Sequence, residues 1–118
     1  MSIEDRLADL GIDLPPVAKP VAAYVPAIQV GDQISTSGQL PLVSGSLPMT
    51  GLVGDQISQG DAAGQARVAA LNALAAAADV AGGVNNIRRV VRVVVYVAST
   101  ADFTAQPAVA NGASELFG

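Results

Sequence analysis

Three short stretches of the chain have the residue pattern of β-strands. The stretches 23–30 and 33–37 flank Gly31-Asp32, which predicts a hairpin with a tight turn. A third stretch, 87–98, is β-branched almost throughout and predicts a long strand. Its alternation separates two faces, Val91, Val93, Val95 and Val97 on one and Val90, Arg92, Val94 and Tyr96 on the other. Both faces are largely apolar, so we expect both to be covered, one by a helix and the other by a second subunit.

A helical repeat predicts one long helix between these strands, from Asp61 to about Val80, with Gly82-Gly83 as its stop signal. The residues expected to lie on the sheet are small or aliphatic: Ala63, Ala66, Ala70, Leu71, Leu74 and Ala78. A last helix is predicted to be capped by Ser99 or Thr100 and to end at Phe117.

Residues 1–18 are predicted to form an N-terminal helical arm ahead of a compact domain over 19–118. Ser2 is suited to cap a helix over 3–10, with Gly11 after its end. Prolines at 15, 16 and 20 then force an extended passage. Residues 41–60 are rich in glycine and proline, which predicts an irregular loop with one short strand at 51–53.

The order strand, strand, short strand, helix, long strand, helix predicts an α+β fold with both helices packed on one face of a sheet. Such a fold is expected to have another strand after the last helix, because the long strand would otherwise leave an open edge. We therefore expect either that the chain is a fragment of a longer polypeptide or that its last strands are missing.

The amino-acid composition limits the kinds of catalytic and binding site that the chain can form. The chain has 118 residues, no cysteine and no histidine, which excludes disulfides, thiol nucleophiles, imidazole triads and the usual zinc sites. Hydrophobic residues make up 51% and charged residues 14%, a balance that favours burial of apolar surface between subunits. The Ala-rich stretch 68–80 is too short to span a membrane. The acidic N-terminus does not resemble a signal peptide, so a cytoplasmic location is expected.

Charge argues against nucleic acid as a partner. The net charge is −4 and the sequence pI is about 4.3, so a phosphate backbone would be repelled overall. The only basic cluster, Arg88, Arg89 and Arg92, lacks the interleaved aromatic residues of an RNA-binding face.

Several residues between 19 and 104 occur in a characteristic order: Tyr24, Gly31, Ser37-Gly38-Gln39-Leu40-Pro41, Gln65-Ala66-Arg67, Asn72, the strand 91–97 with Tyr96, and Asp102-Phe103. In type and order they resemble the YjgF family, also called Rid (reactive intermediate deaminase, endoribonuclease L-PSP-like). The N-terminal arm and the loop at 50–54 resemble a subgroup with an N-terminal extension.

The resemblance implies a chorismate-mutase-like α+β fold in a homotrimer, with small-molecule clefts between subunits. In the deaminating branch of the family, such clefts hydrolyse enamines and imines, including 2-aminoacrylate, to 2-keto acids and ammonia. That reaction uses neither a metal nor a cofactor. An arginine on a late strand holds the substrate carboxylate, and a late glutamate aids the attacking water.

Four residues match ligand-binding positions of the family: Tyr24, Ser37, Gly38 and Tyr96. Each also has a structural interpretation. The Ser37 hydroxyl could instead tie down the turn at Gly38, Tyr24 could be a strand aromatic with a bonded hydroxyl, and Tyr96 is weighed more as core than as ligand contact. Arg92 is interpreted as a partnered interface charge rather than a carboxylate clamp.

The chain also departs from the family pattern. Gln106-Pro107 stands where deaminating members have an asparagine, and the late arginine and glutamate are absent from this chain. Two functions therefore remain open. One is a Rid-like trimer that binds small carboxylates or enamine and imine ligands and hydrolyses the latter. The other is a noncatalytic metabolite-binding or assembly module of the same fold.

Overall fold

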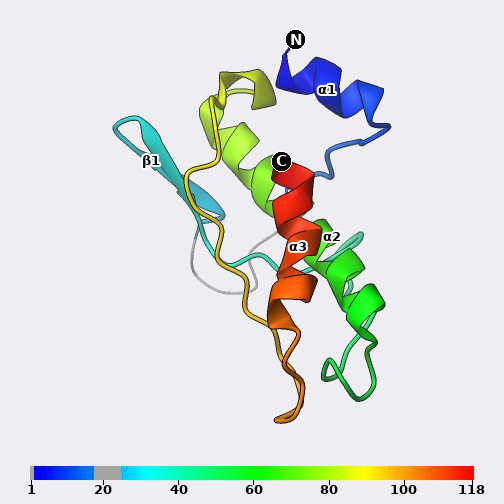
Figure 1. Ribbon diagram of the computed structural model, residues 1–118. Coiled ribbons are helices and arrows are strands. Elements are labelled where there is room, and N and C mark those ends of the chain that lie inside the picture. The colour runs from blue at the N-terminus through cyan, green and yellow to red at the C-terminus, as the bar shows by residue number, and fades with distance from the viewer. Residues whose placement is uncertain (1, 18–24) are drawn as a thin grey trace. The chain divides into compact units, whose positions relative to one another are not determined.

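The computed structural model describes residues 2–17 and 25–118. Its elements, in chain order, are α1 (Ile3–Asp9), β1 (Ala27–Val30), β2 (Gln33–Thr36), α2 (Gln59–Ala81), the 3-10 helix η1 (Val84–Asn86) and α3 (Gln106–Phe117) (Figure 1). The chain divides into two compact units. The first unit comprises the chain up to Gln39 together with 71–90, and the second comprises 40–70 together with 91–118.

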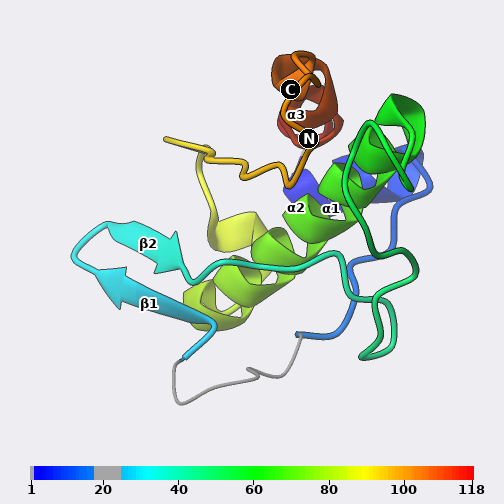
Figure 2. The same ribbon diagram turned by 90° about the horizontal axis from the view of Figure 1, so that it is seen from below.

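The predicted hairpin is present in the first unit. Strands β1 and β2 pair antiparallel, with Ala27 opposite Thr36 and Val30 opposite Gln33, and Figure 2 shows them side by side. Gly31 has a φ of 60°, which a glycine adopts without steric cost and which the tight turn requires. Both strands are shorter than predicted. Positions 23 and 24 of the predicted first strand lie outside the described residues.

The N-terminal helix is confirmed, and it contacts η1. The Ser2 hydroxyl accepts a hydrogen bond from the Asp5 amide at 3.0 Å, which is the predicted N-cap. The Glu4 amide donates to Asn85 Oδ1 at 2.8 Å, and Asn85 Nδ2 donates to Glu4 Oε2 at 3.1 Å. These reciprocal bonds attach α1 to the segment that follows α2.

Helix α2 begins two residues earlier than predicted, because Ser58 caps it: the Ser58 hydroxyl accepts from the Asp61 amide at 3.1 Å. The predicted stop is confirmed, since Gly82 has a φ of 81° and the Gly83 amide donates to the Ala78 carbonyl at 2.9 Å. The prediction of its buried residues holds in part. Ala70 and Ala78 are buried and the other predicted positions are half-buried, whereas the remaining buried residues were not predicted: Ala62, Asn72, Ala75 and Ala76.

A small apolar core forms in the second unit. Val53, Ala62 and Val109 are its buried members, and Phe103 and Val97 are among the half-buried residues that pack against them. The predicted short strand at 51–53 is reduced to isolated bridges. At one of these bridges the Val53 amide donates to the Ala98 carbonyl at 2.9 Å, and the Thr100 amide donates to the Val53 carbonyl at 3.0 Å.

The long strand predicted over 87–98 is not formed within the described residues. Among the described residues, one β-bridge, at Ser99, pairs the end of this segment with another part of the chain, and the sheet has the order β1-β2 alone. Side chains on both faces of this segment are exposed in the single chain, Val91 at 74% and Tyr96 at 92%, so no helix covers either face completely. The expected cover by a second subunit stays a prediction. Alternating side chains favour extended backbone, but a strand also requires a partner for its N–H and C=O groups.

The predicted capping of the last helix is wrong, although its end at Phe117 is confirmed. The segment after Ser99 forms a turn, in which the Phe103 amide donates to the Thr100 carbonyl at 3.2 Å, and α3 begins only at Gln106. Its first turn contains Pro107, whose missing N–H has no helical partner at that position. No helix within the described ranges is both long enough and apolar enough to cross a membrane.

Candidate ligand-binding site

The Ser37 hydroxyl has defined partners within the first unit. Its Oγ donates to the Pro26 carbonyl at 3.2 Å, and Gln39 Nε2 donates to the same Oγ at 3.2 Å. The Ser37 amide also donates to the Pro26 carbonyl, at 2.9 Å. Ser37 therefore ties the end of β2 to the start of β1, a structural role across the hairpin rather than within a turn at Gly38. A hydroxyl has two acceptor lone pairs, so one remains for a ligand N–H beside the bond from Gln39.

Gly38 leaves open space beside the chain. A Cβ atom built on Gly38 would meet no heavy atom of the described chain within 4 Å. The backbone at this position is therefore accessible to a ligand or to a second polypeptide. In Ser37, Gly38 and Gln39 the structure brings together a hydroxyl, an open backbone and a side-chain amide that orients the hydroxyl.

Tyr96 lies in the second unit, on the extended segment that follows Val90. Its exposure of 92% contradicts the interpretation of this side chain as core of the single chain. Arg92, four residues earlier, is also exposed. Tyr24 lies outside the described residues. The family-matched Asn72, at 2% exposure, is the most deeply buried polar residue of the described chain, which makes it a structural residue of α2 rather than a surface ligand contact.

No group of His, Cys, Asp or Glu in the part of the chain that the structure describes is arranged to hold a metal ion. The candidate site therefore consists of hydroxyl, amide and backbone groups. Such groups bind and orient a small polar molecule by hydrogen bonds.

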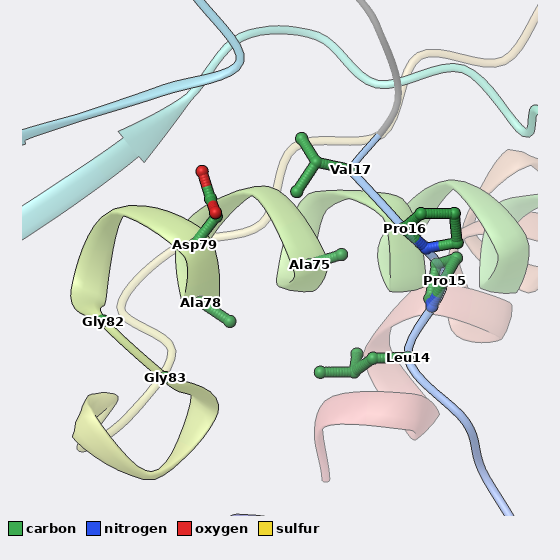
Figure 3. Close-up of a pocket in the computed structure, with 9 residues that line it drawn as sticks. All are labelled: Leu14, Pro15, Pro16, Val17, Ala75, Ala78, Asp79, Gly82 and Gly83. Atoms are coloured by element: carbon green, nitrogen blue, oxygen red, sulfur yellow. The ribbon is translucent and has the colours of Figure 1, made fainter.

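A separate depression of about 480 Å³ lies in the first unit, between residues 14–17 and the end of α2 (Figure 3). The sequence did not predict it. Among the described lining residues, Asp79 alone is charged, and it lies near the end of α2.

Comparison with known proteins gives consistent matches. A model of the family described as "YjgF/chorismate mutase-like, putative endoribonuclease" matches residues 4–118. Protein TCP17 of Trypanosoma cruzi is 38% identical over 111 residues, which cover 94% of this chain and 69% of TCP17.

Two solved structures resemble the chain over 98% of its length. One, described as a putative endoribonuclease from Shewanella oneidensis, is 32% identical with a TM-score of 0.89, and 77% of that chain is covered. The other, the protein Atu1372 of unknown function from Agrobacterium tumefaciens, is 38% identical with a TM-score of 0.78, and 71% of it is covered. The family match over 4–118, together with the α+β fold shared with these structures, shows that the chain belongs to the YjgF/chorismate mutase-like family.

Proposed function

We propose that the protein assembles as a homotrimer and binds small carboxylates, or enamines and imines that carry a carboxylate, in clefts between its subunits. The observation that carries this proposal is the exposure of Tyr96 within an apolar extended segment. Val91, Val94 and Tyr96 are 74%, 51% and 92% exposed. Contiguous apolar surface of this kind marks an interaction site, and extended backbone offers unpaired groups to a neighbouring strand.

A neighbouring subunit on this segment would enclose the Tyr96 phenol and would meet Arg92, which the alternation places on the same face. The phenol then offers a hydrogen-bond donor and acceptor at the edge of an apolar surface. Ser37 and Gly38 supply a hydroxyl and an open backbone. In the proposed assembly these groups orient a ligand of a few heavy atoms, and family membership supports this arrangement.

The proposed reaction is hydrolysis of an imine to a 2-keto acid and ammonia. Water adds its oxygen to the imine carbon, the nitrogen gains protons, and the C–N bond of the resulting carbinolamine breaks as the carbonyl forms. One imine and one water give one keto acid and one ammonia. Because the imine carbon is already electrophilic, the protein's main contributions are orientation and proton donation.

Binding without turnover is the second candidate function. The chain contains no histidine, so no side chain has an unperturbed pKa near neutrality to act as a general base. The Ser37 hydroxyl already donates its proton to the Pro26 carbonyl and accepts a hydrogen bond from Gln39. It is therefore better suited to contact a ligand than to transfer a proton. RNA cleavage, which the family description mentions, is disfavoured for this chain by its net charge of −4.

The native mass tests the assembly. We expect about three times the 11.8 kDa subunit mass. The variant Val94→Lys places a charge in the apolar segment and should shift the mass toward that of the subunit. Thr104→Lys is the matched control, because it adds the same charge at another exposed position of the second unit and should leave the mass unchanged. The proposal would be contradicted if the wild-type protein stayed monomeric at a protein concentration on the order of 100 micromolar.

The ligand is tested separately. With 2-aminoacrylate generated in situ by a serine dehydratase, the wild type should accelerate pyruvate and ammonia release, and Tyr96→Phe should reduce that acceleration. If 2-keto acids raise the unfolding temperature without any acceleration, the noncatalytic function is supported instead. If neither effect is seen with a trimeric protein, the ligand part of the proposal is wrong.

A further inference from the structure

The depression beside α2 is wide open to solvent and has the volume of a small-molecule site. One wall is the segment Leu14–Val17 and the other is the last part of α2 with Gly82 and Gly83 (Figure 3). Its volume of about 480 Å³ lies within the range of known ligand pockets, roughly 300 to 1,000 Å³. Leu14 and Val17 both line the depression.

The lining chemistry is apolar with one carboxylate. Apart from Asp79, the lining residues in the described part of the chain contribute aliphatic side chains, prolines and glycine backbone. A second depression, of about 380 Å³, shares Leu14 with the first and is lined by two further acids, Glu4 and Asp13. All charged side chains among the described lining residues of the two depressions are therefore acidic.

The end of α2 adds to this negative potential. A helix C-terminus carries a partial negative charge, which basic residues in the last turn normally offset. The last turn of α2 contains no basic residue, and Asp79 lies two residues before Ala81, the last residue of the helix. The partners of the final carbonyls are neutral groups: the Gly83 amide bonds to the Ala78 carbonyl at 2.9 Å, and Asn86 Nδ2 bonds to the Ala81 carbonyl at 2.8 Å.

We propose that this depression binds a small organic cation, namely an ammonium with a short apolar body. The ammonium lies at the Asp79 carboxylate near the negative end of α2, and the apolar body lies against Leu14, Pro15 and Ala75. An anion of the same shape would be repelled by Asp79 and by the helix end. The site is therefore distinct from the proposed carboxylate cleft in both location and ligand charge, and it stands whether or not that cleft functions.

The experiment is an NMR titration of the full chain with 2-phenylethylamine as the probe. We expect amide shifts centred on Ala75, Ala78, Gly82 and Gly83, with a dissociation constant of millimolar order. 3-Phenylpropionate, which has a similar body and the opposite charge, should bind at least tenfold more weakly. Added salt should weaken amine binding, because the ammonium–carboxylate contact is partly exposed.

Two variants connect the binding to named residues. Asp79→Asn keeps the shape and removes the charge, so amine affinity should fall roughly two- to fivefold, as expected for an exposed ion pair. Asp102→Asn removes an equal charge from the second unit and should leave the affinity unchanged. Val17→Lys places a fixed ammonium at the depression and should abolish binding. The dispersion of each free-protein spectrum reports whether the variant is folded.

Three results would overturn the proposal. The first is binding of 3-phenylpropionate as tight as that of the amine. The second is equal affinity in Asp79→Asn and Asp102→Asn. The third is an amine-induced shift pattern spread over the surface instead of centred on the depression, which would mean nonspecific association.

Discussion

Gly112 in α3 provides a sharp test of packing in the second unit. A Cβ atom on Gly112 would lie 2.7 Å from the carbonyl carbon and 3.1 Å from the Cα of Ala63, and it would overlap the Ala63 carbonyl oxygen. Helices α2 and α3 approach so closely at this point that only glycine fits. We therefore expect Gly112→Ala to destabilise the protein, although alanine is the better helix former.

The magnitude follows from two opposing effects. Replacing glycine by alanine inside a helix stabilises by up to about 1 kcal/mol. Inserting a methyl group where backbone atoms already stand costs typically about 1–3 kcal/mol, because the neighbouring helix must move. Gly64 in α2 isolates the first effect, since a Cβ atom there would meet nothing within 4 Å. Relative to Gly64→Ala, the variant Gly112→Ala should be less stable by about 1–3 kcal/mol.

Thermal unfolding at one fixed protein concentration measures this difference. For a domain of 118 residues, 1 kcal/mol corresponds to about 4 °C, so the two variants should differ by about 4–12 °C. Urea unfolding of both variants should give the same order without a change in m. If Gly112→Ala is as stable as Gly64→Ala, the close contact between Gly112 and Ala63 does not exist in solution.

Three further predictions concern hydrogen bonds. Asn85→Asp removes the donor to Glu4 and sets two carboxylates together, so amides of α1 should exchange roughly 3- to 10-fold faster; unchanged exchange would mean that α1 is held elsewhere. Ser37→Ala should lower the free energy of unfolding by about 1 kcal/mol, whereas Ser35→Ala, at an exposed position, should stay within about 0.5 kcal/mol of wild type. Equal free energies for the two variants would mean that the Ser37 hydroxyl does not stabilise the hairpin. Gln106 Nε2 donates to the Phe103 carbonyl at 2.8 Å, so Gln106→Ala should cost about 1 kcal/mol and speed exchange in the first turn of α3, and a neutral result would contradict that role.

Local signals in the sequence were sufficient for several elements. The cap at Ser2, the turn at Gly31 and the stop at Gly82-Gly83 each depend on a few neighbouring residues, and the structure has all three. The start of α3 was also predicted from a local signal, and that prediction was wrong. Ser99 and Thr100 are good capping residues, but here they make other hydrogen bonds. The Thr100 carbonyl accepts from the Phe103 amide, and the Ser99 hydroxyl accepts from Gln106 Nε2. The preference of a residue type for helix caps does not show whether its hydroxyl will cap a helix or bond to another nearby group.

The candidate site shows a similar limit. The sequence predicted Ser37 at the end of a strand and matched Ser37 and Gly38 to ligand-binding positions of the family, but the bonds of Ser37 to Pro26 and Gln39 could not be predicted from it. They depend on the register of the hairpin, which brings residues eleven positions apart into contact. The depression at Asp79 was missed because its walls come from segments about sixty residues apart, and neither segment carries a motif.

The segment 87–98 shows why periodicity alone does not establish a strand. Its β-branched alternation sets an extended backbone, yet pairing requires an edge at the right place, and that edge is supplied by other residues or by another chain. In the single chain the apolar side chains of Val91 and Tyr96 are exposed. An exposed apolar strand is a stable feature only when something covers it. The native mass of Val94→Lys is therefore the measurement that connects the sequence pattern with the proposed function, because the same charge would disrupt both the covering contact and the cleft that Tyr96 would line.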